Sequence, residues 1–555
     1  MSPTARRVLG GLGGAAAMIA AITVLSRVLG FGRYLVQAGA VGAGSISGTY
    51  NSANMLPNIV FEAAAGGALA GALIPLLALP VARGLRRDVD AVASAALGWT
   101  LLVLVPVGAL LALLAGPIAA VWPGLDDAHR ELLRFFVVVF AVQVPLYGVA
   151  VLLYAVLQAH KRFFWPAFAP VMSSVVVIAV YAVYGAMAQG EWDDPAAAGQ
   201  DALQVLAWGT TAGVAVMSLP MFWPVHRLGV RLRPTLRFPA GVGRRLAALA
   251  FAGVGSLVAQ QLAMLVVVVV SSARGGGATF SLYLWSQQVY LLPYAVLVVP
   301  LATSTFPRLA ARAAAGRLGE YAVMASATTR AVVTAAAVGA AAVAAAAPAV
   351  ADVFGALTGR AGSTTAMSST ITLLVPGLVG FAAMFHASRA LYALERGRAA
   401  VTANVLGWGT SAVGSLVLGA VLVPDGRDPA RTLTALAVAS SVGMLVGGTA
   451  AVVGLARAAG REAVVGLART TTVVVAAGVV AAAAGRWVVD AVETLTGTGV
   501  WSAIGAAAGG AVVAVVVMAG AVALLDRRTV TQMVRLEREP APEAGVPAAV
   551  PDPTE

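Results

Sequence analysis

The sequence predicts an all-α polytopic membrane protein with 14 transmembrane helices, arranged as two six-helix lobes and two C-terminal helices. Of its 555 residues 60% are hydrophobic and only 11% are charged, which is far too apolar for a soluble protein. Apolar segments of about 20 residues, enough to cross the hydrocarbon core, recur fourteen times. Basic residues gather in alternate loops, as the positive-inside rule requires.

The predicted helices follow these apolar segments in chain order. The first six are predicted at residues 14–41, 49–82, 91–121, 132–158, 164–188 and 202–225. The next eight are predicted at residues 246–272, 279–306, 322–350, 366–392, 399–423, 432–456, 465–485 and 499–525. The second span is too long for one straight crossing. Pro57 and the glycines at 66, 67 and 71 predict that it is kinked or partly unwound.

The loops divide the chain into domains and orient it in the membrane. Most of the 36 basic residues lie in loops on the side where the chain starts, so both termini are expected in the cytoplasm. The longest of these loops, 227–245, is predicted to be a basic linker between lobes at 1–226 and 246–457. Both lobes start on the same side, as parallel repeats do. The last two helices are predicted within 458–526, and the proline-rich tail, 527–555, is predicted to be disordered at its end.

Composition and motifs argue against an enzyme. The chain has 0 cysteines, which excludes disulfides, thiolate metal sites and cysteine catalysis, and its 4 histidines are scattered, so no metal centre is expected. Its single lysine, Lys161, lies outside any phosphate-binding loop, so neither a nucleotide cofactor nor ATP-driven transport is expected. The net charge is +12, but no basic segment carries interleaved aromatic residues on a soluble fold, and we predict no nucleic-acid partner.

Two arginines interrupt the first apolar segment. Residues 26–33 read Ser-Arg-Val-Leu-Gly-Phe-Gly-Arg. An arginine near the bilayer centre costs about 2.5–3.5 kcal/mol, so Arg27 and Arg33 are expected to hold an anion or to line a wet cavity. The alternative is that both reach one membrane interface. Six residues rotate a side chain by about 240° on a regular helix, so a break at Gly30 and Gly32 is expected to bring both guanidinium groups to one cavity.

Polar side chains in other predicted helices complete the candidate cavity. The alternative for each amide is that it only pairs helices, a contact worth about 0.6 kcal/mol. Glu62 is expected to pair with an arginine of the first helix when the cavity is empty, or else to meet bulk water. The cavity and coupling candidates are Asn51, Asn54, Asn58, Glu62, Gln260, Gln261, Gln287 and Gln288.

Two stretches resemble the MurJ (MviN) lipid II flippases, within the superfamily of multidrug, oligosaccharidyl-lipid and polysaccharide exporters. The first is residues 26–33, followed by Leu-Pro-Asn at 56–58 and a glycine-rich segment that ends at Pro75. The second is residues 157–170, where Arg-Phe runs into Pro-Ala-Phe-Ala-Pro, similar to the family's loop between its fourth and fifth helices. The hydropathy pattern extends the resemblance over about residues 10–525.

The chain also departs from the family pattern. Phe61 and Glu62 stand where many relatives have a basic pair, and Gln287 and Gln288 stand where they have an acidic and a basic residue. The arginines of the first helix are therefore kept while several cavity charges are lost.

The resemblance implies a carrier that moves an undecaprenyl-diphosphate-linked glycan, above all lipid II, to the outer leaflet of the bacterial plasma membrane for cell-wall synthesis. It implies alternating access, with the diphosphate bound by Arg27 and Arg33 and the lipid tail along the last two helices. Membrane lipids and cell-wall synthesis proteins would be its partners. A membrane potential or an ion gradient would drive it. The alternatives are another flippase or a drug/cation antiporter of the superfamily, or a scaffold that does not transport.

Overall fold

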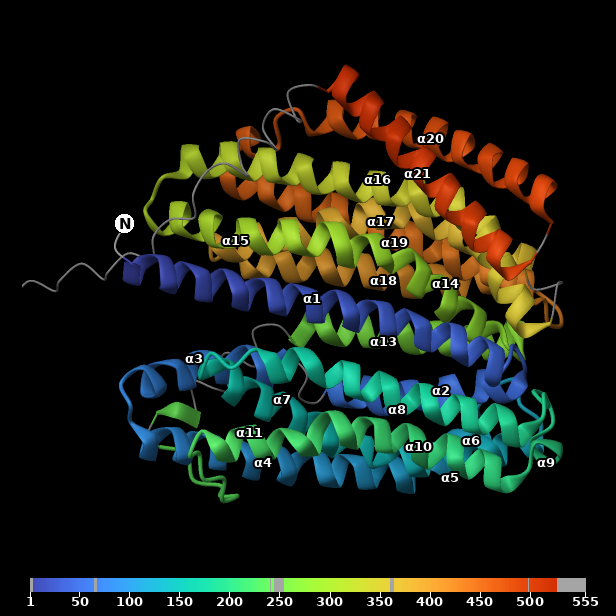
Figure 1. The fold of residues 1–555 in the computed structure, drawn as a ribbon, viewed down its shortest axis with the longest axis horizontal. Coiled ribbons are helices and arrows are strands. Elements are labelled where there is room, and N and C mark those ends of the chain that lie inside the picture. Colours follow the sequence, from blue (N-terminus) through green and yellow to red (C-terminus); the bar gives the residue numbers. More distant parts are fainter. Residues whose placement is uncertain are drawn as a thin grey trace, which may run out of the picture.

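The computed structural model describes residues 3–63, 67–239, 241–243, 254–359, 364–497 and 499–526 (Figure 1). This part of the chain consists of helices and the turns between them, so the predicted all-α fold class is confirmed. The predicted tail at 527–555 lies outside it. The helices are α1 (Pro3–Ala40), α2 (Ser45–Phe61), α3 (Gly67–Ala82), α4 (Arg86–Leu113), α5 (Ala115–Val121), α6 (Asp127–Ala141), α7 (Gln143–Ala159), α8 (Phe164–Ala188), α9 (Pro195–Ala198), α10 (Gln200–Ser218), α11 (Phe222–Arg227), α13 (Val254–Val270), α14 (Thr279–Pro293), α15 (Val299–Ala314), α16 (Leu318–Thr358), α17 (Thr364–Ala393), α18 (Gly397–Leu422), α19 (Pro429–Ala459), α20 (Leu467–Thr496) and α21 (Val500–Leu525).

Twelve spans among the described residues are long and apolar enough to cross a membrane. They begin with Arg86–Leu113 and end with Val500–Leu525, and some join two helices end to end. α1 and the pair α2–α3 precede them. A total of fourteen crossings requires that both of these cross as well, so that number stays a prediction.

α1 shows that the expected helix break at Gly30 and Gly32 is wrong. It is a single helix of 38 residues and runs unbroken through Gly30 and Gly32. A Cβ atom built at either glycine would meet no other atom within 4 Å, so these glycines leave an open strip on the helix instead of a break. A glycine costs about 1 kcal/mol in a helix interior. An unsatisfied backbone group in the bilayer costs several kcal/mol, and this larger cost favours the continuous helix.

Two other predicted spans that contain prolines are each made of more than one helix. The second span is split between α2 and α3, and Pro57 lies inside α2, so the helix ends after the proline and not at it. The eighth span is split at Pro293, where a π-helical turn, Tyr294–Val298, joins α14 to α15. A proline removes a backbone hydrogen bond and so favours such interruptions. Residues 246–253, the start of the predicted seventh helix, lie outside the described part of the chain.

The helices form two groups (Figure 1). In the first helix group, α1–α11, α8 packs against α1 and α10, and α4 packs against α7. In the second helix group, α13–α21, α19 packs against α17 and α18, and α16 packs against α17, α20 and α21. α1 also contacts α14 and α16, so it links the groups. The predicted lobe boundaries stay a prediction.

Candidate functional site

Arg27 and Arg33 line one pocket of about 430 Å³, which we call the arginine pocket. α1 forms one wall, the start of α8 forms another, and the end of α14 with the following turn forms the third. The two arginines reach the same space although α1 is unbroken between them, because each is long enough to extend around the helix. Gln288 of α14 lines the pocket with them.

The two guanidinium groups keep hydrogen-bond donors that no acidic side chain in the described part of the chain occupies. Arg33 donates to the Tyr34 hydroxyl over 3.5 Å, and its Cζ lies 5.2 Å from the centre of that ring. Among the described residues, neither Arg27 nor Arg33 has a carboxylate within the 4.0 Å of an ion pair. Two positive charges therefore face the pocket without a negative partner, an arrangement that suits an anion.

The start of α8 adds to the positive character of the arginine pocket. Pro166, Ala167 and Pro170, all within the second stretch that resembles the flippase family, line this pocket. α8 begins at Phe164, so its first turn lies at the pocket wall. The N-terminus of a helix carries a partial positive charge and favours a nearby anion. Two sequence stretches that lie far apart in the chain thus build one site.

A second pocket, of about 250 Å³, collects Asn58, Gln260, Gln261 and Gln287, and we call it the glutamine pocket. Its walls come from α2, α13, α14 and the helices α17–α19. Leu291 lines both pockets, so they lie side by side. Four of the predicted cavity residues therefore meet in one place. Gln287 and Gln288 are neighbours in sequence but line different pockets.

The other three candidates line neither of these pockets. Asn51 is buried between helices, where Gln37 Nε2 donates to its Oδ1 over 2.9 Å. The buried Oδ1 of Asn54 has no hydrogen-bond partner. Glu62 follows the last residue of α2 and forms no ion pair with Arg27 or Arg33. The expected pairing of Glu62 with an arginine is not formed in this conformation.

Sequence analysis missed a buried polar contact between the two helix groups, which we call the α2–α14 junction. Ser47 and Ser281 share a hydrogen bond of 2.9 Å, and Asn51 Nδ2 donates to Ser281 Oγ over 2.8 Å. Trp285 Nε1 donates to Gln37 Oε1 over 2.9 Å. The available signal is the spacing of the polar residues. Ser47 and Asn51 in α2 are four residues apart, and so are Ser281 and Trp285 in α14, which places each pair on one face of its helix.

Glycines allow the backbones to approach closely beside this junction. A Cβ atom built at Gly48 of α2 would overlap the carbonyl oxygen of Gly277, which precedes α14. A Cβ atom at Gly124 would overlap the carbonyl oxygen of Ser272 in the same way. Both contacts join the first helix group to the second, so the backbones of the two groups touch beside the α2–α14 junction.

Comparisons with known proteins identify the family. The sequence profile described as Lipid II flippase MurJ matches residues 37–534. A probable lipid II flippase MurJ of Rhizobium meliloti is 28% identical over 321 residues, which cover 55% of this chain and 56% of the relative. A lipid II flippase MurJ of Burkholderia cenocepacia is 29% identical over 306 residues, which cover 52% of this chain and 55% of that relative. The chain spans about half the length of the curated relatives it matches.

Solved structures share the fold. A lipid II flippase MurJ in an inward closed conformation superposes with a TM-score of 0.69 at 14% identity, covering 90% of this chain and 98% of that chain. An inward-facing multidrug transporter of the MATE family superposes with a TM-score of 0.63 at 15% identity, covering 82% of this chain and 99% of that chain. The chain therefore shares the fold of these two structures. Because the family profile matches most of the sequence, the chain belongs to the lipid II flippase MurJ family.

Proposed function

We propose that this protein flips lipid II from the cytoplasmic to the outer leaflet of the bacterial plasma membrane. The observation that carries the proposal is the arginine pocket, where Arg27 and Arg33 face one space without an acidic partner among the described residues. A guanidinium group matches phosphate oxygens in charge and in fork geometry, so the two side chains suit a diphosphate. The names of the relatives supply the identity of the lipid that carries it.

The glutamine pocket extends this site toward the glycan. Asn58, Gln260, Gln261 and Gln287 offer amide donors and acceptors, which suit the hydroxyl and amide groups of an aminosugar-peptide headgroup. The shared wall at Leu291 allows one ligand to occupy both pockets. The long apolar tail would lie along α20 and α21, which pack against α16 at the edge of the second helix group.

Transport follows if the two helix groups rock against each other. With both termini in the cytoplasm, the α2–α14 junction lies at the external end and closes the pockets from outside. Outward release then requires the hydrogen bonds of Ser281 to Ser47 and Asn51 to break. The rigid units would correspond to residues 1–226 and 246–457. A membrane potential or an ion gradient supplies the work, since one charge moved through 100 mV yields about 2.3 kcal/mol.

Thiol labelling of introduced cysteines tests which end of the molecule faces outward. Because the chain has 0 cysteines, a single introduced cysteine is the only site for a thiol reagent. Cysteines at Asp193 and Asp425, in loops at the junction end, are expected to react with an impermeant maleimide in intact cells. Cysteines at Arg86 and Arg237 are expected to react only after the membrane is permeabilised. Labelling of Arg237→Cys in intact cells would contradict the orientation.

Purified protein in lipid vesicles tests the activity itself. The expected result is that lipid II added to one leaflet appears in the other much faster than in vesicles without protein. A drug/cation antiporter would instead move cationic dyes against a cation gradient and leave lipid II in place. A scaffold would do neither, so the three outcomes separate the three functions. Cell-wall synthesis proteins that accept lipid II outside are the expected partners.

A further inference from the structure

Part of the basic linker after α11 is attached to the first half of α4, and we call it the α4-bound segment (residues 230–237). The backbone N–H of Arg231 donates to Oδ1 of Asp90 over 2.9 Å, and the backbone N–H of Arg233 donates to Oγ of Ser94 over 3.0 Å. The Ser94 hydroxyl in turn donates to the carbonyl of Arg231 over 3.2 Å. These bonds make the segment a fixed part of the first helix group.

Gly98 and Trp99 hold the far end of the α4-bound segment. A Cβ atom built at Gly98 would lie 2.2 Å from the carbonyl oxygen of Thr235, so the backbone of the segment approaches α4 where α4 has no side chain. Nε1 of Trp99 donates to the carbonyl of Leu236 over 3.0 Å. The segment therefore follows α4 from Asp90 to Trp99, a rise of about 14 Å along the helix.

The charge pattern of α4 and α5 indicates how deep the α4-bound segment lies in the membrane. Residues 101–121 carry no charged side chain and extend about 30 Å, the thickness of the hydrocarbon core. Residues 86–90 carry four charged side chains. Between these ranges lies Trp99, which is 44% exposed, and tryptophan gathers at the membrane–water interface. The segment is therefore placed at the level of the lipid headgroups.

The arginine side chains at this level are exposed. Arg231, Arg233 and Arg237 belong to the α4-bound segment, and Arg227 ends α11 just before it. Among the described residues, none of the four has a carboxylate within the 4.0 Å of an ion pair. The Cζ of Arg227 lies 4.1 Å from the ring centre of Trp223, which is itself 50% exposed. Unpaired positive charge beside an exposed apolar ring suits a lipid better than a soluble acidic protein.

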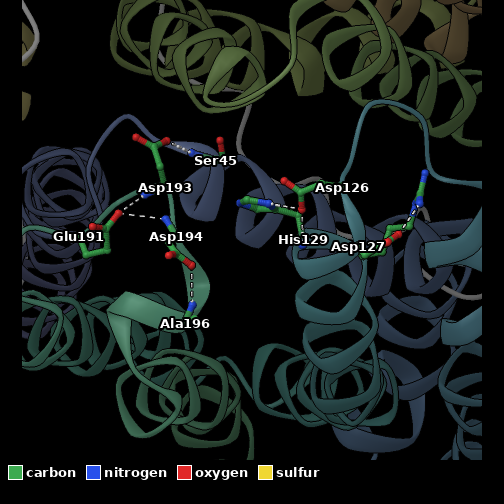
Figure 2. A network of polar contacts seen from close by, with 9 residues as sticks. Ser45, Asp126, Asp127, His129, Glu191, Asp193, Asp194 and Ala196 are labelled. Atoms are coloured by element: carbon green, nitrogen blue, oxygen red, sulfur yellow. Dashed lines mark hydrogen bonds and ion pairs between the residues drawn. The ribbon is translucent and has the colours of Figure 1, made fainter.

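The loops beyond the other end of α4 and α5 have the opposite character (Figure 2). There, carboxylates accept hydrogen bonds from nearby backbone groups. Asp126 accepts from the N–H of His129, and Glu191 accepts from the N–H groups of Asp193 and Asp194. Acidic loops of this kind repel an anionic headgroup. The two ends of the first helix group therefore present different charges to the membrane.

We propose that the α4-bound segment is a binding surface for the headgroups of anionic phospholipids. Each phosphate would accept hydrogen bonds from a guanidinium group, which matches it in charge and in fork geometry. The acyl chains would lie beside the exposed side chains of Trp223 and Leu236. Anionic membrane surfaces attract basic segments next to membrane helices. Such contacts would hold the first helix group at a fixed depth, whichever substrate the protein carries.

Hydrogen–deuterium exchange in nanodiscs tests this surface without lipid II. The protein is placed in discs of phosphatidylcholine alone and in discs that also contain phosphatidylglycerol. We expect phosphatidylglycerol to slow exchange at the amides of residues 230–237 several-fold, and high salt to reduce the effect by screening the charges. The acidic loop at 191–194 is the internal reference and is expected to exchange equally in both discs. Inorganic phosphate added to discs of phosphatidylcholine is expected to have no effect, because the surface binds lipid and not the free ion.

Variants separate the charge of the segment from its position. Arg231→Gln combined with Arg233→Gln is expected to remove most of the phosphatidylglycerol effect. Arg396→Gln combined with Arg398→Gln removes the same charge from exposed positions of the second helix group and is expected to retain the effect. Gly98→Ala keeps every arginine but adds a Cβ atom that overlaps the segment, so it is expected to weaken the effect as well.

Three results would overturn the lipid surface. The first is exchange at residues 230–237 that is the same with and without phosphatidylglycerol, as expected if the arginines serve a soluble acidic partner. The second is a full effect in the double glutamine variant of the segment, and the third is a full effect in Gly98→Ala. The glutamine variants change only exposed side chains, so they keep the test decisive if Gly98→Ala does not fold.

Discussion

Replacing both Arg27 and Arg33 by alanine is expected to abolish lipid II flipping while the protein still folds in the membrane. Hydrogen bonds to charged groups contribute about 1.5–3 kcal/mol each. The loss of one such bond from each arginine slows transport by at least about a hundredfold, since about 1.4 kcal/mol corresponds to a factor of ten. Insertion becomes easier without the charges. The measurement is the initial rate at which lipid II crosses in vesicles that contain equal amounts of each protein.

Two controls isolate the role of the guanidinium groups. Arg33→Lys is expected to restore only part of the rate, because an ammonium group is a point charge without the planar fork. Arg398→Ala removes an exposed arginine at the start of α18, outside both pockets, and is expected to leave the rate unchanged. A double alanine variant that flips lipid II at the normal rate would reject the diphosphate role.

A disulfide across the α2–α14 junction is expected to stop transport completely. Ser47 and Ser281 lie in hydrogen-bond contact at 2.9 Å and are both fully buried, so cysteines at these positions lie close enough to be oxidised to a disulfide. The bond would hold the helix groups together at the external end and prevent outward opening. The rate is measured before oxidation, after it and after reduction, and reduction is expected to restore it.

The matched controls are the two single variants, Ser47→Cys and Ser281→Cys, treated with the same oxidant. Each has one thiol in a chain with 0 native cysteines, so neither forms an internal disulfide, and both should keep their rates. Full cross-linking of the double variant with no loss of transport would mean that the groups do not separate at this junction.

The sequence predicts that Arg27 and Arg33 bind the substrate, which stays a prediction, but it does not predict how the two side chains come together. Arg27 and Arg33 stand out because an arginine inside an apolar segment is costly. The expected helix break between them was wrong. Helix hydrogen bonds in an apolar solvent outweigh the cost of Gly30 and Gly32, and long side chains reach around the helix without a break. The part played by the start of α8 appears only when the chain is folded, because its residues lie more than a hundred positions away.

The sequence does not predict which pocket each amide side chain lines. Gln287 and Gln288 both look like cavity residues, but consecutive residues on a helix point about 100° apart, so only packing decides which pocket each one lines. Gln37 and Ser281 gave no signal on their own. The structural role of a single polar residue in a membrane helix depends on the residue that it contacts. Here the contacting residues lie far apart in the chain, so the sequence does not reveal them.

Gly48 determines more than the shape of the closed junction. Any side chain there would overlap the backbone carbonyl of Gly277, and a backbone cannot turn aside as a side chain does. Overpacking of this kind typically costs about 1–3 kcal/mol. If only the closed state bears that cost, the ratio of open to closed molecules changes by about 5–150-fold. The time that the resting carrier spends in each state therefore depends on the absence of a single methyl group.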